Sequence, residues 1–359
     1  MKMEQAVFRP GGNPLEDPAF SGRSARRADT DYVYPSARIR ALETGLMDTA
    51  RTMRLMEAQD TVEFGRLLSE AGYPAAETNG RSLNAGFTRA CAVARDLSLE
   101  KGYIDLFYFE GDIINAKVFL KHFAGGETVS YDDLGSRIAS PASVDPFRLY
   151  EAIRDKDPSG AHIPDWLWTA VMGAYADFAA TGDGSRVDIR LDTAYAAESA
   201  RIADVLGNAW FARYVAMRAD LANLGMLLRS RRAGFTREFL HESLLPGGVV
   251  APAAIEAMAG LPDDALTEAW RNTPYAALVA ATASDYARTG GAGRFSKAAD
   301  DLLMRHVREA RRVSFGPEVA VAYVFAVQTE VRNARIILSF LRNQIDPAGA
   351  RELLRETYL

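Results

Sequence analysis

The chain has 359 residues, of which 48% are apolar and 25% are charged, close to the average for soluble globular proteins. This balance excludes a collagen-like or largely disordered chain, and the length leaves room for two or three domains. The 42 basic and 47 acidic residues give a net charge of −5, which disfavours wrapping around nucleic acid. We therefore expect no nucleic-acid partner.

The first thirty residues are rich in Gly, Pro and Arg and lack the apolar core of a signal peptide. We predict that residues 1–30 form a flexible N-terminal arm. Helical periodicity begins near Tyr34, and apolar side chains recur at spacings of three, four and seven between residues 39 and 56. A second helix is predicted over residues 61–71 and a third around Cys91, which we expect to be a small buried residue rather than a nucleophile.

Later segments are also predicted to be helical. The apolar stretches 166–176 and 319–328 are too short to span a membrane and are predicted to be core helices. The pairs Asp263–Asp264 and Asp300–Asp301 are predicted to cap helix N-termini or occupy first turns. Only residues 185–191 alternate as a strand would, without an obvious partner. The predicted fold class is all-α.

Three segments share a pattern in which an acidic residue precedes an asparagine by three positions and a leucine follows five later. They start 108 and 110 residues apart, at positions 112, 220 and 330. If the nine asparagines were placed at random, about one would follow an acidic residue by three positions, and equal spacing between such pairs would not be expected. The nine residues are Asp112, Asn115 and Leu120; Asp220, Asn223 and Leu228; and Glu330, Asn333 and Leu338.

This period predicts three copies of one helical unit, at residues 31–139, 140–248 and 249–359. Solenoid units are shorter, so we expect three helical bundles around a pseudo-threefold axis. An acid and an asparagine three positions apart share one helix face, where an amide can bind a turn or helix end. We interpret the nine residues as a repeated structural latch, since the pairs lack the base or metal partner that three active sites would need.

Motifs for catalysis are otherwise missing from the sequence. There is no phosphate-binding loop, the four histidines are scattered, and a lone cysteine can supply neither a disulfide nor a multi-cysteine zinc site. We therefore expect no catalytic residue, cofactor site or metal site. Five arginines are possible rim contacts, although ordinary solvated charge explains them better: Arg38, Arg40, Arg229, Arg231 and Arg232.

Two stretches suggest a family. One is YPSARIRALETGL at residues 34–46; the other runs from Phe315-Gly-Pro-Glu to the final Leu354-Arg-x3-Tyr358. They resemble the C subunit of archaeal and bacterial V/A-type rotary ATPases, which is similar to the d subunit of eukaryotic V-ATPases. The resemblance runs from about Tyr32 to Leu359, and residues 140–210 depart most from it.

This resemblance implies an all-helical funnel of three similar domains that is a non-catalytic part of a central rotor. Its partners would be the shaft subunits of the ATP-hydrolysing head and the membrane ring of ion-carrying proteolipid subunits. It would lie at the cytoplasmic face of the membrane as a peripheral subunit, with no small-molecule substrate of its own. Whether the pumped ion is H⁺ or Na⁺, and whether ATP is made or consumed, is left open.

Two other classes of protein remain as alternatives. A helical scaffold or adaptor unrelated to rotary ATPases would explain the helices and the repeat but not the C-terminal pattern. An all-α enzyme would use carboxylates such as Asp192, Glu198 or Asp204. A converging polar cleft would favour the enzyme, and co-purification with shaft or ring subunits would favour the rotor.

Overall fold

The structure is a computed structural model that describes residues 29–124, 131, 134–135 and 137–359. Within these ranges every regular element is a helix, so the prediction of an all-α fold is confirmed. The predicted arm, residues 1–30, lies outside the described residues except for its last two positions. No helix among the described residues is both long enough and apolar enough to cross a membrane.

The first third of the chain is helical from Asp29 onward. Side chains at the N-termini of three of its helices, Asp48, Asp60 and Thr78, accept hydrogen bonds from first-turn amides, which satisfies donors that have no partner within the helix. The elements are η3 (Asp29–Tyr32), α1 (Val33–Glu43), α2 (Thr49–Met56), α3 (Thr61–Glu70), α4 (Asn79–Leu97) and α5 (Gly102–Ala124). Cys91 is fully buried in α4, as predicted.

The middle third holds α6 (Pro146–Asp155), α7 (Asp165–Thr181), α8 (Ser185–Leu206), α9 (Ala209–Ala233) and α10 (Arg237–Ser243). The alternating segment 185–191 lies in α8, so its strand signal was misleading. Val187 and Leu191 are both fully buried, and their separation of four positions puts them on one helix face. Glycines in the left-handed region follow α7, α8 and α9.

The last third contains α11 (Pro252–Met258), α12 (Asp263–Ala269), α13 (Ala276–Thr289), α14 (Ala292–Val307), η5 (Arg308–Arg312), α15 (Pro317–Arg342) and α16 (Pro347–Leu353). Asp263 and Asp264 lie in the first turn of α12, as predicted. The prediction for Asp300 and Asp301 is wrong. Because α14 already begins at Ala292, inside the glycine-rich segment, both aspartates lie in its interior.

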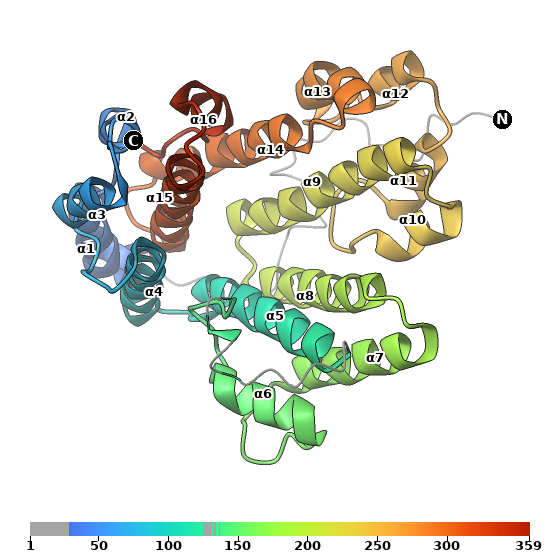
Figure 1. The fold of residues 1–359 in the computed structure, drawn as a ribbon, viewed down its shortest axis with the longest axis horizontal. Coiled ribbons are helices and arrows are strands. Elements are labelled where there is room, and N and C mark those ends of the chain that lie inside the picture. Colours follow the sequence, from blue (N-terminus) through green and yellow to red (C-terminus); the bar gives the residue numbers. More distant parts are fainter. Residues whose placement is uncertain (1–28, 125–130, 132–133, 136) are drawn as a thin grey trace.

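The three segments with the repeated pattern lie in three long helices, α5, α9 and α15, which we call the motif helices. Each packs against a helix of another third of the chain: α5 against α8, α9 against α14, and α15 against α4. Figure 1 shows that the last of these contacts places red α15 beside blue and teal α1–α4. The two ends of the described chain therefore meet, and Thr49 lies 3.3 Å from Thr357 between their hydroxyl oxygens.

The buried apolar side chains form two clusters. The larger joins helices α1–α4 to α9–α15, and the smaller is formed by α5–α8 around residues such as Phe119, Leu167 and Leu191. The domain boundaries predicted at 139/140 and 248/249 both fall in loops.

Candidate functional site

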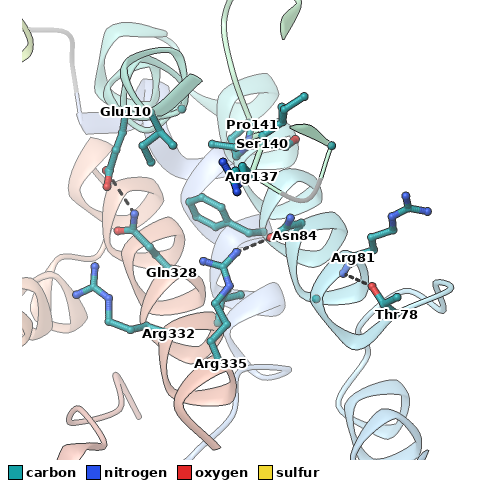
Figure 2. A pocket seen from close by; sticks show the side chains of 18 of the residues that line it. Thr78, Arg81, Asn84, Glu110, Arg137, Ser140, Pro141, Gln328, Arg332 and Arg335 are labelled. Carbon is teal, nitrogen blue, oxygen red and sulfur yellow. Dashed lines mark hydrogen bonds between the residues drawn. The ribbon is translucent and has the colours of Figure 1, made fainter. Parts of the chain in front are cut away.

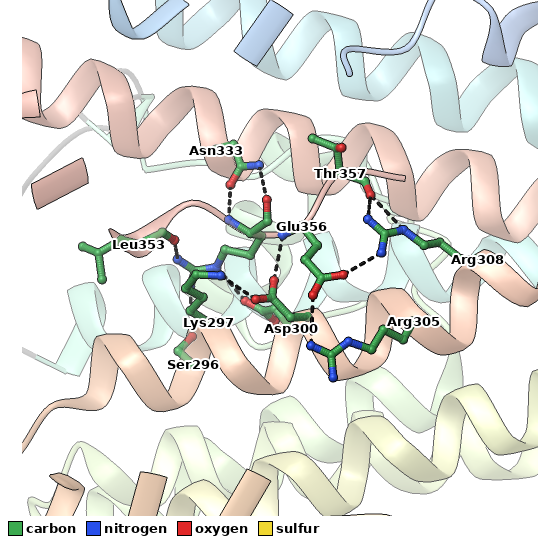
Figure 3. A network of polar contacts seen from close by, with 11 residues as sticks. Ser296, Lys297, Asp300, Arg305, Arg308, Asn333, Leu353, Glu356 and Thr357 are labelled. Carbon is green, nitrogen blue, oxygen red and sulfur yellow. Dashed lines mark hydrogen bonds and ion pairs between the residues drawn. The ribbon is translucent and has the colours of Figure 1, made fainter. Parts of the chain in front are cut away.

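Each of the three repeated asparagines is buried and binds the backbone of one residue 22–24 positions later. Its side-chain NH₂ donates to the carbonyl oxygen of that residue, and its Oδ1 accepts from the amide of the same residue. The partner of Asn115 is Ala139 (3.2 and 2.7 Å), that of Asn223 is Leu245 (2.9 and 2.7 Å), and that of Asn333 is Arg355 (3.0 and 2.8 Å; Figure 3). Each asparagine side chain thus supplies the hydrogen-bond acceptor and donor that the backbone N–H and C=O of a non-helical residue need.

The first two repeated acids bind loops that lead into the next third of the chain. Oδ1 of Asp112 accepts from the amides of Ser143 and Val144 at 2.9 and 3.0 Å, just before α6. The carboxylate of Asp220 accepts from the amides of Val249 and Val250 at 3.0 and 3.1 Å, just before α11. Both aspartates are fully buried.

The third acid, Glu330, makes the corresponding contact with the first third of the chain. The first two acids bind loops 29–32 positions later in the chain, whereas the backbone partner of Glu330 lies 283 positions earlier. Its Oε1 instead accepts from the amide of Met47 at 2.6 Å, just before α2. Val144, Val250 and Met47 each lie two positions before the first residue of the helix that follows.

Tyrosine hydroxyls complete two of the carboxylate sites. The hydroxyl of Tyr73 donates to Oε2 of Glu330 at 3.1 Å, and that of Tyr275 donates to Oδ2 of Asp220 at 2.8 Å. At Asp112 the hydroxyl of Ser143 takes this place.

Burial governs the protonation of these acids. Loss of solvent raises the pKa of Asp112 and of Asp220 to about 6 and that of Glu330 to about 8, although hydrogen bonds from the surrounding donors oppose the shift. The pKa values of Tyr73 and Tyr275 also rise well above their usual value, mainly through burial. These tyrosines therefore remain hydrogen-bond donors, and the acids are poorly suited to chemistry that needs an exposed charge.

The three repeated leucines, Leu120, Leu228 and Leu338, are buried at 2–4% exposure. Leu120 belongs to the smaller apolar cluster, whereas Leu228 and Leu338 belong to the larger one.

Three residues that precede the repeated acids by two positions lie together. Arg218 donates to Oε2 of Glu110 at 3.1 Å, and the amide of Gln328 donates to the same oxygen at 3.4 Å. These residues come from α9, α5 and α15 and share the 108- and 110-residue spacing of the motif. An acid, a base and an amide thus occupy equivalent positions where the motif helices approach one another.

Around these three residues the motif helices line a hollow made of two adjoining compartments, which share Glu110, Gln328 and Arg332. The first, of about 980 Å³, lies between α4, α5, α15 and loop residues 137–141. The second, of about 670 Å³, lies between α9, α14 and α15. Figure 2 shows the first compartment, into which Glu110, Gln328, Arg332 and Arg335 extend. In the part of the chain that the structure describes, eight arginines and three carboxylates line the hollow.

Only one of the five candidate rim arginines, Arg229, lines this hollow. Arg40 and Arg231 bind backbone carbonyls of neighbouring loops, and Arg232 binds the carbonyl of Ala287, so these three serve internal contacts. Arg38 is exposed on α1.

The carboxylates of the alternative enzyme hypothesis all lie on α8. Asp192 accepts from Lys117 at 2.6 Å, Glu198 pairs with Arg201 at 2.7 Å, and Asp204 is exposed. Among the described residues no group of three or more His, Cys, Asp or Glu could hold a metal ion.

The cluster of Glu110, Arg218 and Gln328 was not predicted from the sequence. A search for repeated residue types cannot find it, because the three side chains differ. Extending the alignment of the three motifs by two positions toward the N-terminus would have found it.

Comparisons with known proteins agree with the resemblance of the chain ends. A family model described as ATP synthase (C/AC39) subunit matches residues 35–353. The C subunit of the A-type ATP synthase of Pyrococcus furiosus is 20% identical over 362 residues, covering 91% of each chain. The proteins of the same name from Pyrococcus abyssi and Pyrococcus horikoshii are 23% and 26% identical over 144 and 149 residues, about 40% of this chain and 39% of each relative. The chain belongs to the ATP synthase (C/AC39) subunit family.

Proposed function

We propose that this protein is the non-catalytic central-stalk subunit of a V/A-type ATPase or ATP synthase. In this role it connects the rotating shaft of the ATP-hydrolysing head to the membrane ring of proteolipid subunits, and so couples ATP turnover to H⁺ or Na⁺ transport. The observation that carries the proposal is the hollow lined by three equivalent helices in a member of this family. The shaft would enter this hollow.

We further propose that residues 31–139, 140–248 and 249–359 are three similar units around a pseudo-threefold axis, together forming a funnel. The cyclic order of helix contacts supports this arrangement, because each motif helix packs on the unit that follows it and α15 returns to α4. The acids support it independently, since Asp112 and Asp220 each bind a loop at the start of the next unit and Glu330 binds the loop before α2 in the first unit.

The nine repeated residues would then be structural latches, in keeping with the rotor role. Torque reaches the membrane only if the connecting part does not deform, and dense packing makes protein interiors weakly compressible. The buried amides and acids tie each motif helix to its own unit and to the next one. Their cyclic arrangement would close the units into one stiff body.

As a peripheral subunit at the cytoplasmic face, the protein would contact the shaft on one side and the ring on the other. The alternative is a helical scaffold outside rotary ATPases. Co-purification distinguishes the two, because a tagged copy of the chain should recover shaft and ring subunits only if it belongs to the rotor.

Deletion of the gene tests the proposal. Membrane vesicles from the deletion strain should lose ATP-driven ion pumping and regain it when the gene is restored on a plasmid. ATP hydrolysis by the detached head should continue, because the catalytic sites lie on other subunits in this proposal. Unimpaired pumping without the gene would refute the assignment.

A further inference from the structure

We propose that the segment received by the hollow is amphipathic and acidic, and that arginines on the side of α15 and of loop residues 137–141 recognise its carboxylates. This inference rests on the proposed function in taking the end of the shaft as the occupant. It adds the chemistry of that occupant and the part of the hollow that binds it.

The lining of the hollow is basic although the chain as a whole is acidic. Among the described residues of the lining, eight arginines face three carboxylates, in a protein whose net charge is −5. Three of the arginines, Arg332, Arg335 and Arg342, lie on α15. A concave surface of one charge sign attracts and orients a partner of the opposite sign.

The three carboxylates are already engaged. Glu110 accepts from Arg218, and Glu77 pairs with Arg81. Asp300 is shared between two arginines: Arg332 lies 2.6 Å and Arg355 2.9 Å from its Oδ2 (Figure 3 shows this aspartate). Among the described residues, no carboxylate of the lining is therefore left to pair with the remaining arginines.

Four arginines of the lining have no carboxylate within ion-pair distance among the described residues: Arg137, Arg229, Arg335 and Arg342. Arg335 donates only to the neutral side-chain oxygen of Asn84. Figure 2 shows Arg137 and Arg335 in the same part of the hollow, although one comes from a loop and the other from α15. These two residues and Arg342 make the first compartment the more basic of the two.

The electrostatics of Arg335 favour an incoming anion. Partial desolvation and the neighbouring positive charge of Arg332 both lower the pKa of Arg335, although its side chain remains exposed at the surface of the hollow. A charge held under these conditions gains more from a carboxylate than a fully solvated arginine would, because water screens it less.

Apolar side chains between the arginines indicate that the occupant is a protein segment rather than a small anion. Phe87, Ile114 and Ile336 line the first compartment, and Ile114 is 41% exposed. Leu221 and Met226 line the second. Covering these surfaces requires apolar side chains alongside the carboxylates, as on an amphipathic helix.

Binding of the full-length chain to the purified shaft subunits of the same complex tests the inference. The variant Arg335→Glu with Arg342→Glu reverses two charges in the hollow. The control, Arg237→Glu with Arg312→Glu, makes the same change in net charge at exposed positions of α10 and η5, outside the hollow. Affinity is measured by calorimetry from 0.05 to 0.5 M NaCl, with circular dichroism and melting temperature recorded for every variant.

We expect the hollow variant to bind the shaft at least tenfold more weakly than the control at 0.1 M NaCl, with the difference shrinking as salt rises. Should the reversed pair unfold the protein, Arg335→Gln with Arg342→Gln should still weaken binding and reduce its salt dependence. Equal affinities for the hollow variants, the control and the unaltered chain would overturn this inference and leave the proposed function standing. Failure of the unaltered chain to bind the shaft would overturn both.

Discussion

Replacing Asn333 by leucine tests the latch directly. Leucine has a similar volume but neither donor nor acceptor, so the carbonyl and amide of Arg355 lose the partners they have at 3.0 and 2.8 Å. Each unpaired buried backbone group costs about 1–3 kcal/mol, and the added apolar surface recovers part of this. We therefore expect the free energy of unfolding to fall by about 2–4 kcal/mol.

Other contacts hold the same C-terminal segment, which determines how the loss will show. The amide of Glu356 donates to Asp301 at 2.7 Å, and the Arg355 side chain binds Asp300 (Figure 3). The segment should thus loosen locally before the fold is lost. Hydrogen exchange at residues 353–358 should rise along with the fall in melting temperature.

Asn343 provides the matched control for this substitution. Asn343 lies exposed just after the same helix, and its side-chain NH₂ donates to the carbonyl oxygen of Ser339 at 2.7 Å. Asn343→Leu should change the melting temperature by less than half as much as Asn333→Leu. Equal melting temperatures and equal exchange at residues 353–358 in the two variants would show that the buried amide does not act as a latch.

Three further predictions concern the same repeat. Glu330 has a pKa of about 8 in the fold against 4.5 normally, so its contribution to stability is complete below about pH 4.5 and is lost as the pH rises through 8. Glu330→Gln should therefore flatten the dependence of the melting temperature on pH between about pH 5 and 9. An unchanged dependence would contradict the raised pKa of Glu330. In Gly248→Ala the new Cβ would lie 2.1 Å from Oδ1 of Asp220, so the free energy of unfolding measured by thermal denaturation should fall by about 1–3 kcal/mol. Gly260→Ala, which has open space around the new Cβ, should lower it much less. Equal losses in the two variants would argue against a close approach at Gly248. Leu228→Ala should lower the free energy of unfolding in urea by about 2–5 kcal/mol, and a loss below 1 kcal/mol would mean that the site collapses around the smaller side chain.

How much of this site the sequence could predict depends on the kind of signal involved. Residues that repeat in type, such as Asn115 and Asn223, could be found from their spacing alone, and helical periodicity indicated the fold class. Their partners could not be found in this way, because Ala139 and Leu245 bind through backbone atoms. Nearly every residue type has the same backbone groups, so such a contact does not restrict the sequence.

The contact of Glu330 with Met47 was harder still to predict from the sequence, because the two residues are 283 positions apart. Only the assumption that the three repeats pack in a ring would have suggested this contact, because no residue pattern indicates which loop binds Glu330. The misplacement of Asp300 had a different cause. Gly290, Gly291 and Gly293 are typical of a loop, yet α14 begins at Ala292 and includes Gly293, and it packs against α9 and α13.

In the arrangement we propose, three units in one chain allow the equivalent positions to differ, and the cluster of Glu110, Arg218 and Gln328 illustrates the consequence. Three identical subunits would place three glutamates or three arginines together, and like charges at this distance repel one another strongly in a partly desolvated site. An acid, a base and an amide instead form one hydrogen-bonded group. The same freedom lets arginines gather on α15 while α5 contributes Glu110, so the hollow can have one strongly basic side. In the proposed rotor role, a socket with one distinct side would hold an asymmetric shaft in a single orientation, which transmission of torque without slipping requires.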